Sequence, residues 1–264
     1  MAEHDVRTIL KAVASDEMSL EEAERKIAST HFSKLGHLAE LDLEREKRAG
    51  FPEVVFGASK TAEHIAQIVA ALVEHSGKAF VTKLDPEKAS AVMTSNPHAE
   101  LKYNPVSQTL RTLKCITPKS ATLKAAVVSG GTSDLPVVQE AEDTLAFCGW
   151  DVECFNDVGV AGLERLLKIC PKLDRADVIV AVAGMEGALP TVLAGLIATP
   201  IIAVPTSVGY GVSSDGMAAL HGMLASCAPG LSVVNIDNGF GAAVAAHRIL
   251  LGKCHKEELT NHGR

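Results

Sequence analysis

Four glycine-rich segments contain the side chains best suited to bind and act on a small polar ligand. Each follows a short apolar run: residues 129–134, 184–190, 205–211 and 235–241. Glycine adopts positive φ at no steric cost and lets a ligand approach the backbone. Glycine also serves tight turns that bind nothing, so one such segment alone decides little. Four of them at one end of one predicted sheet favour a shared pocket.

The first segment offers donors for phosphate. Its sequence is Ser129-Gly130-Gly131-Thr132-Ser133-Asp134, and it precedes a helix predicted from about Leu135 to Cys148. Unpaired N–H groups and the positive end of a helix dipole together hold phosphate. Asp134 is most simply the cap of that helix. A contact with a ribose or a phosphate would be an additional role.

Glu186 and Cys227 are the candidates for proton transfer and nucleophilic attack. Glu186 lies between Gly184 and Gly187, where a carboxylate in a partly dry cleft acts as a general base or acid. A solvated loop charge is the alternative. Cys227 lies in the stretch 225–230, at the end of a predicted helix of small residues. A thiolate there would be a strong nucleophile, whereas most cysteines in such settings are small buried hydrophobes.

For several other polar or reactive residues the sequence allows more than one role. Asp237 would orient a metal ion or a water molecule, or cap the last helix. His247, Cys254 and His255 suggest a metal site near the C-terminus, but a helical tail is the favoured interpretation. The remaining cysteines lack a CxxC pair and metal-site spacing, and we interpret them as reduced thiols. They are Cys115, Cys148, Cys154 and Cys170.

The elements that position these residues follow a regular rhythm after Leu123. Apolar strands are predicted at 125–128, 150–155, 177–183, 200–204 and 232–236, with helices between them and a last helix from about Gly241 to Leu250. This alternation implies parallel strands joined by right-handed crossovers. The predicted fold is a three-layer α/β domain with a flavodoxin-like parallel sheet. Ligands of such sheets bind outside the carboxyl ends of the strands.

The first half predicts a smaller α/β domain. Its expected elements are helices near Val6–Ala14, after a cap at Ser19, over Thr61–Ser76 and from Asp85-Pro86, and strands at 54–57 and 78–84. The segment Thr94–Thr122 has the weakest periodicity, and the linker is placed at its end. The predicted division is residues 1–122, residues 123–252 and a tail of residues 253–264.

Composition narrows the class of partner. The chain of 264 residues carries a net charge of −7, which disfavours nucleic acid and acidic membranes as partners. Its longest apolar stretch, Val192–Val204, is interrupted by Pro200 and is too short to span a bilayer. The N-terminus lacks the apolar core of a signal peptide. We therefore expect a cytoplasmic protein that binds neither nucleic acid nor a membrane.

The segment 129–134 resembles the phosphate-binding loop of aminoimidazole ribonucleotide carboxylases. Residues 183–190 and 200–205 resemble later parts of the same fold. Those purine enzymes carry a catalytic histidine just before a Leu-Pro pair, where this chain has Ala188. The departure argues against the purine reaction.

The chain is more similar to the LarB family of nickel-pincer nucleotide biosynthesis. The similarity runs from about Leu41 to Ala246 and is carried by residues 184–190, 204–211, 226–230 and 234–241, with Leu41-Asp42, Arg45, Arg48 and residues 50–55. The resemblance implies carboxylation of the pyridinium C5 of nicotinic acid adenine dinucleotide with CO₂ from bicarbonate. It also implies hydrolysis of the phosphoanhydride, giving pyridinium-3,5-biscarboxylate mononucleotide and AMP.

The resemblance also implies the groups involved. It assigns to Cys227 a covalent bond to C4 of the ring, and Glu186 is our candidate base. Mg²⁺ would assist the hydrolysis, with Asp237 or Asp134 as possible ligands and no organic cofactor. Relatives of this fold assemble as octamers, so we expect a homo-oligomer. The residues expected to bind substrate are Ser129, Gly130, Gly131, Thr132, Ser133, Asp134, Gly184, Met185, Gly187, Thr206, Ser207, Gly209, Asn238 and Gly239.

Two other functions compete with this one. A purine-pathway carboxylase or mutase is disfavoured by Ala188, and a noncatalytic nucleotide-binding protein is disfavoured by the presence of Cys227 and Glu186. In the first half, Arg45 and Arg48 would either help to bind anions or form a solvated charged face.

Overall fold

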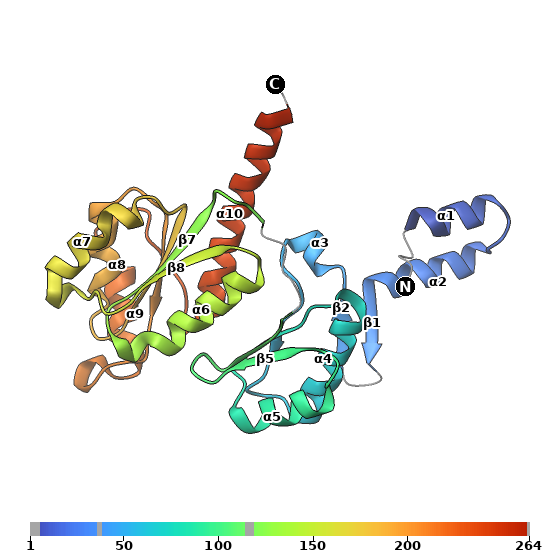
Figure 1. Ribbon diagram of the computed structural model, residues 1–264, viewed down its shortest axis with the longest axis horizontal. Coiled ribbons are helices and arrows are strands. Elements are labelled where there is room, and N and C mark those ends of the chain that lie inside the picture. Colours follow the sequence, from blue (N-terminus) through green and yellow to red (C-terminus); the bar gives the residue numbers. More distant parts are fainter. Residues whose placement is uncertain (1–5, 36–38, 114–118, 263–264) are drawn as a thin grey trace.

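The computed structural model describes residues 6–35, 39–113 and 119–262, which form a small mixed α/β domain and a larger parallel one (Figure 1). No helix within these ranges is long and apolar enough to cross a lipid bilayer. Cys115 lies outside the described residues, as does the side chain of His255.

The larger domain is built on a five-stranded sheet in which all neighbouring strands are parallel. Its strands are β7 (Lys124–Ser129), β8 (Asp151–Phe155), β9 (Val178–Ala183), β10 (Ile201–Pro205) and β11 (Ser232–Val233). Their order across the sheet is β11-β10-β9-β7-β8, which is flavodoxin-like and confirms the predicted fold class. The strand order reverses between β7 and β9, and ligand crevices form beyond the carboxyl ends of strands at such a point.

Helices cover both faces of this sheet. On one face lie α6 (Leu135–Phe147) and α10 (Gly239–His262), and on the other lie α7 (Leu163–Leu173), α8 (Ala188–Leu196) and α9 (Met217–Leu224). Short 3₁₀ turns precede three of these helices: η1 (Thr132–Asp134), η2 (Val160–Gly162) and η3 (Gly211–Gly216).

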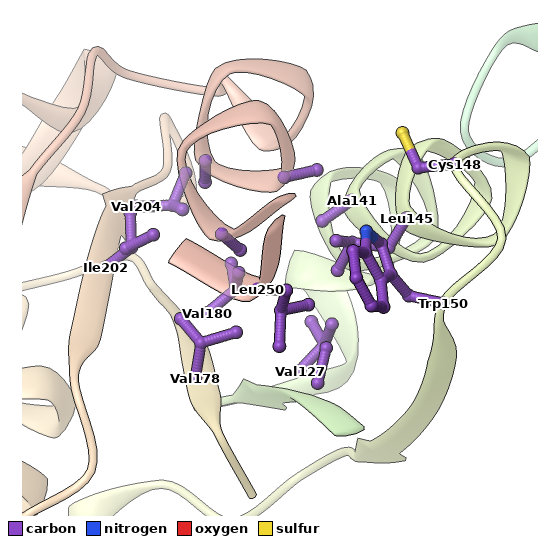
Figure 2. Close-up of a cluster of buried hydrophobic side chains, with 14 of the residues drawn as sticks. Val127, Ala141, Leu145, Cys148, Trp150, Val178, Val180, Ile202, Val204 and Leu250 are labelled. Atoms are coloured by element: carbon purple, nitrogen blue, oxygen red, sulfur yellow. The ribbon is translucent and has the colours of Figure 1, made fainter. Parts of the chain in front are cut away.

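The central strands fill both layers, because successive side chains of a strand point to opposite faces. Val178 and Val180 pack with Leu145 and Leu250 on the α6–α10 side, as Figure 2 shows. Ile179 belongs to the core on the opposite side. Since every residue of β9 is buried, its sequence is continuously apolar rather than alternating.

The small domain has a four-stranded sheet in the order β3-β4-β6-β5. Its elements are β3 (Val55–Phe56), α4 (Ala62–Ser76), β4 (Phe80–Thr82), α5 (Pro86–Ser95), β5 (Leu101–Asn104) and β6 (Thr109–Thr112). Strands β3 and β4 are parallel, and the other pairs are antiparallel. The predicted helix starts are confirmed: Thr61 accepts a hydrogen bond from the His64 amide, and Asp85 accepts one from the Lys88 amide.

The chain begins with a helical hairpin, α1 (Val6–Ala14) and α2 (Leu20–His31), that stands away from the small domain in Figure 1. The Ser19 hydroxyl accepts a hydrogen bond from the Glu22 amide, which confirms the predicted cap. A two-stranded sheet of β1 (Phe32–Leu35) and β2 (Ala39–Asp42) follows, and α3 (Arg45–Ala49) leads into the small domain.

The small domain packs against the larger one through α6 and α10. Phe51 meets Phe240 edge to face, with ring centroids 5.6 Å apart. The buried His247 on α10 joins the domains by hydrogen bonds. Its Nδ1 accepts from Trp150 Nε1 at 2.8 Å, and its Nε2 lies 2.6 Å from the carbonyl oxygen of Gly50.

Several elements differ from the sequence prediction. Within the segment 94–122, where no element was expected, β5 and β6 form an antiparallel hairpin. Its turn begins where the Asn104 side chain accepts a hydrogen bond from the Val106 amide. Strand β11 is shorter than predicted. The Val234 amide still donates to the Ala203 carbonyl, but the chain then turns at Asn235, whose side chain accepts from the Ile236 amide. Helix α10 starts two residues earlier than predicted and runs on to His262.

Candidate active site

Asp134 lies at the centre of a buried polar cluster at the carboxyl edge of the parallel sheet. Its side chain is 3% exposed. One carboxylate oxygen accepts a hydrogen bond from the Thr206 hydroxyl at 2.7 Å, and the other accepts from the Gly131 amide at 3.0 Å. Asp134 occupies the N-cap position of α6, as predicted, but its carboxylate makes no capping hydrogen bond to that helix. It closes a capping box on η1 through the Gly131 amide and bonds to Thr206 in the loop after β10.

Burial raises the pKa of the Asp134 carboxyl above its usual value of 3.8. The hydrogen bonds from Thr206 and Gly131 act in the opposite direction, and the negative charge of Asp237 adds a smaller increase. Desolvation disfavours the charged form of a carboxyl, whereas donors directed at it favour that form.

Asp237 joins the last two loops of this edge. Its amide donates to the Pro205 carbonyl at 2.9 Å, and its carboxylate accepts from the Ser207 amide at 2.9 Å. Asp237 does not cap the last helix, because the neighbouring Asn238 side chain does so by accepting from the Gly241 amide at 2.7 Å. We call Asp134, Thr206, Ser207 and Asp237 the anchored cluster.

The loop after β9 is packed too tightly for larger side chains. A Cβ atom on Gly184 would lie 2.2 Å from the Val208 carbonyl oxygen and 2.7 Å from the Thr206 hydroxyl. Met185 adopts a left-handed φ of 54°, which is uncommon outside glycine. Its amide donates to the Val208 carbonyl at 2.8 Å. Close backbone contact therefore requires glycine at position 184.

Most of the first segment's own N–H groups are already paired. The Gly130 amide donates to the Val182 carbonyl, and those of Gly131 and Asp134 donate within the segment. Ser129 is fully buried and donates to Asn156 at 3.3 Å. Thr132 and Ser133 are exposed, so their hydroxyls are accessible to solvent. They are the groups in this segment best placed to meet a phosphate.

Glu186 and Cys227, the candidate pair, are both exposed; Glu186 lies in the loop after β9, and Cys227 follows the end of α9. Helix α9 connects them, because a Cβ on its Gly222 would lie 2.4 Å from the Glu186 carbonyl oxygen. Five residues later comes Cys227. Its neighbour Ser226 accepts a hydrogen bond from Thr191, in the first turn of α8, at 2.8 Å.

The other predicted substrate-binding residues also belong to these loops. Thr206 is fully buried, Ser207 is exposed, and a Cβ on Gly209 would lie 2.2 Å from the Ser213 carbonyl oxygen. Gly187 starts α8 with a φ of 69°. Gly239 starts α10 so close to α6 that a Cβ would lie 2.3 Å from the Val137 carbonyl oxygen.

The described residues do not form a dedicated metal cage. Among them, no group of three or more His, Cys, Asp or Glu side chains is arranged to hold a metal ion. Both oxygens of Asp134 already accept hydrogen bonds. Mg²⁺ is commonly held by one or two carboxylates together with substrate phosphates rather than by an all-protein cage.

Three other cysteines and His247 lie in surroundings that disfavour their charged forms. Burial raises the pKa of the Cys148 and Cys154 thiols to about 12, and it raises that of Cys170 as well. Burial likewise lowers the pKa of His247 below 6.5. Arg45 and Arg48 pair with Glu53 and Asp42 on the surface of the small domain, which favours the charged-face interpretation.

Sequence reasoning missed two residues next to the site, Lys83 and Glu140. Lys83 Nζ donates to the Asp237 carbonyl oxygen at 2.9 Å and to Glu140 at 3.0 Å. These residues are 154 and 57 positions apart from Lys83, so no local pattern links them. The only local signal was Glu140 itself, a glutamate at a position that faces the core once α6 packs on the sheet.

Models of known protein families match both parts of the chain. The LarB/PurE-like N-terminal domain matches residues 32–114, and AIR carboxylase matches residues 124–262. An uncharacterised protein of Methanocaldococcus jannaschii is 39% identical over 247 residues, which cover 92% of this chain and 95% of the relative.

The second half alone is similar to N5-carboxyaminoimidazole ribonucleotide mutases. That of Methanocaldococcus jannaschii is 36% identical over 129 residues, covering 47% of this chain and 76% of the relative. That of Pyrococcus horikoshii is 32% identical over 141 residues, covering 51% and 76%. Together these similarities support an enzyme of the carboxylase or mutase type.

Proposed function

Because the chain belongs to the LarB family, with a C-terminal domain like AIR carboxylase, we propose that it carboxylates nicotinic acid adenine dinucleotide. The carboxyl group is added at C5 of the pyridinium ring, from CO₂ or bicarbonate. The phosphoanhydride is hydrolysed, and the products are pyridinium-3,5-biscarboxylate mononucleotide and AMP.

The observation that supports this proposal is the exposure of Cys227 just after α9, the helix that contacts the Glu186 loop. Cys148 and Cys154 are held in apolar surroundings where a thiolate is strongly disfavoured. Cys227 is exposed and follows the helix that touches the Glu186 loop. Cysteine nucleophiles need such access, because the thiolate is the reacting form.

A thiolate solves the main chemical difficulty of the reaction. The pyridinium ring is electron-poor, so its C5 cannot attack CO₂. When the Cys227 sulfur bonds to C4, the ring becomes a dihydropyridine with a neutral nitrogen, and C5 gains enamine character. C5 then bonds to CO₂, and the ring nitrogen becomes part of an iminium. Glu186 removes the C5 proton, which restores the enamine, and expulsion of the thiolate from C4 restores the aromatic ring.

The loops of the edge provide the binding surface in this proposal. Thr132 and Ser133 offer hydroxyls to the phosphates, and Ser207 and Asn238 offer polar groups from the neighbouring loops. The anchored cluster keeps these loops in register, because its carboxylates bond to groups on three of them. Mg²⁺, if it serves the hydrolysis, enters with the phosphates, and no step above passes through it.

A homo-oligomer is part of the same proposal. Large exposed apolar side chains occur just before η3, within it and at the end of α9: Tyr210 is 76% exposed, Val212 97% and Leu224 64%. Isolated exposed apolar residues are ordinary, but a group of large ones suits an interface. Mass photometry of the purified protein measures the assembly, and a monomer at micromolar concentration would refute this part.

The direct test is to incubate the purified protein with nicotinic acid adenine dinucleotide, Mg²⁺ and ¹³C-bicarbonate. We expect AMP and a ring product heavier by one labelled carboxylate, detected by mass spectrometry. A parallel incubation with N5-carboxyaminoimidazole ribonucleotide tests the activity for which the second-half relatives are named. Turnover of that compound alone would replace the proposal, and binding without any product would leave a nucleotide-binding protein.

Glu186→Gln tests the role of the base. The amide keeps the size of the side chain but cannot take the C5 proton, so we expect carboxylation to slow by about 10²–10⁴-fold. Glu164→Gln, on the exposed face of α7, is the matched control and should leave the rate unchanged. An unaffected rate in Glu186→Gln would return Glu186 to the status of a solvated loop charge.

A further inference from the structure

A fully buried carboxylate lies at the joint between the two domains, and the proposed reaction does not use it. Glu140 projects from α6 and is 0% exposed. Both of its oxygens are satisfied: one accepts from the Thr82 hydroxyl, and the other accepts from Lys83 Nζ at 3.0 Å and from the Phe240 amide at 3.2 Å. Buried carboxylates persist in proteins only with such partners.

These partners come from three separate parts of the chain. Thr82 and Lys83 belong to the small domain, at the end of β4. Phe240 lies in the first turn of α10, whose unpaired N–H groups attract a negative charge. Glu140 thus accepts a hydrogen bond from the Phe240 amide at the start of α10. Asn238 caps the same helix by accepting from the Gly241 amide.

Lys83 extends this joint into the candidate active site. Besides Glu140, its ammonium donates to the Asp237 carbonyl oxygen at 2.9 Å. Asp237 in turn holds Ser207 through its carboxylate. Lys83 and Asp237 both adopt left-handed backbone conformations, with φ of 53° and 54°. Non-glycine residues keep this conformation only where surrounding contacts enforce it.

We propose that Lys83 and Glu140 are positioning residues, through which the small domain holds the loop 235–241 in the geometry that binds substrate. The parallel domain alone contains Glu140 and the loop, but the cation that joins them is supplied by the small domain. This inference rests on the proposed function for its kinetic readout only, since the order of the loop is measurable without turnover.

The matched variants are Lys83→Met and Lys88→Met. Lys88 is a partly exposed lysine of the same domain that bonds to Asp85 and to the carbonyls of Gly57 and Ala58, and none of these contacts reaches the larger domain. Hydrogen–deuterium exchange followed by mass spectrometry should show faster exchange in peptides covering 235–242 for Lys83→Met. The same peptides should be unchanged in Lys88→Met, and the peptides of β7 and β9 should be unchanged in both.

Loss of Lys83 leaves the buried Glu140 without its cation, and this can unfold the chain. The double variant Lys83→Met, Glu140→Gln avoids that outcome, because an amide at 140 can accept from the Phe240 amide and donate to the Thr82 hydroxyl. We expect it to fold, with the loop 235–242 still exchanging faster than in the parent protein.

For the parent reaction, we expect the double variant to raise KM for nicotinic acid adenine dinucleotide about tenfold with kcat within about twofold, as loss of a binding geometry does. Faster exchange throughout both domains would mean a merely structural joint and would overturn the inference, as would unchanged exchange in 235–242. If the parent protein turns over no dinucleotide, the proposed function fails, and the exchange measurement still decides the positioning role.

Discussion

The anchored cluster and the candidate pair differ in how their polar groups are satisfied. Asp134 accepts a hydrogen bond from Thr206, and Asp237 accepts one from the Ser207 amide in the same loop as Thr206. Asp134 and Thr206 are buried. Glu186 and Cys227 are exposed, and no hydrogen bond of their side chains is recorded within the described ranges. One group is organised by the fold, whereas the other is left available for a substrate.

This difference indicates a division of labour. A cluster bonded around a buried carboxylate keeps loops in place, because polar groups left unpaired there would cost free energy. Exposed side chains are free to meet a ligand and to exchange protons with water. We therefore expect substitutions in the cluster to affect stability first, and substitutions in the candidate pair to affect chemistry first.

Cys227→Ala should give the largest effect. Removal of the sulfur leaves no group to activate C5, so ring carboxylation should fall to the background rate while the melting temperature stays that of the parent protein. Product formation is measured by mass spectrometry and folding by circular dichroism. Cys170→Ala is the control, because Cys170 lies on α7 on the far side of α8 and its thiol bonds to the Leu166 carbonyl. A fully active Cys227→Ala protein would remove the covalent step.

Alkylation should separate the cysteines by their surroundings. At pH 8 iodoacetamide should modify Cys227 at least about a hundredfold faster than Cys148 or Cys154, because the thiolate reacts and burial holds the pKa of the latter two at about 12. Peptide mapping after short exposures measures each site. Equal rates at Cys227 and Cys148 would contradict the difference in exposure.

Two substitutions at Asp134 should separate its hydrogen bonds from its charge. Asp134→Ala leaves the Gly131 amide and the Thr206 hydroxyl without an acceptor, so we expect a loss of about 1–3 kcal/mol in the free energy of unfolding. Asp134→Asn keeps both bonds if the Thr206 hydroxyl rotates to accept, and it removes a buried charge. Chemical denaturation at pH 7 should rank the proteins with Ala lowest and Asn close to the parent. The opposite order would show that the charge itself stabilises the edge.

The pH dependence of the Asp134 variant follows from the raised pKa. The folded protein binds this proton more tightly than the unfolded chain, so the contribution to stability is present below pH 3.8 and is lost as pH rises through the folded pKa. Any advantage of Asp134→Asn over the parent should therefore shrink on acidification.

His247 should make the domain joint sensitive to acid. Its pKa is lowered by burial, so its contribution to stability is present above pH 6.5 and is lost as pH falls through the folded pKa. Protonation would also remove the acceptor for Trp150 Nε1. His247→Leu should lower the melting temperature at pH 8, and the gap to the parent protein should narrow at pH 5. A gap that is constant across this range would exclude His247 as the titrating group.

The parallel sheet could be predicted from sequence because its evidence is local. A continuously apolar run such as Val178–Ala183, followed by glycine and a helix, can pair only where both faces are covered. The β5–β6 hairpin escaped prediction because its short strands mix threonine, arginine and tyrosine, and Leu110 is buried in a core that includes residues far away in the chain, on β3, β4, α4 and α5.

The amino-acid sequence by itself indicated which loops meet at the carboxyl edge and which residue types they carry, since alternating strands and helices imply parallel strands whose carboxyl ends share one edge. Only the tertiary structure decided what each carboxylate does. The carboxylates of Asp134 and Asp237 bond to the loop after β10, and Glu140 joins the two domains. The physical reason is that hydrogen bonds and desolvation depend on atoms far apart in the chain, such as Asp134 and Thr206, 72 residues apart.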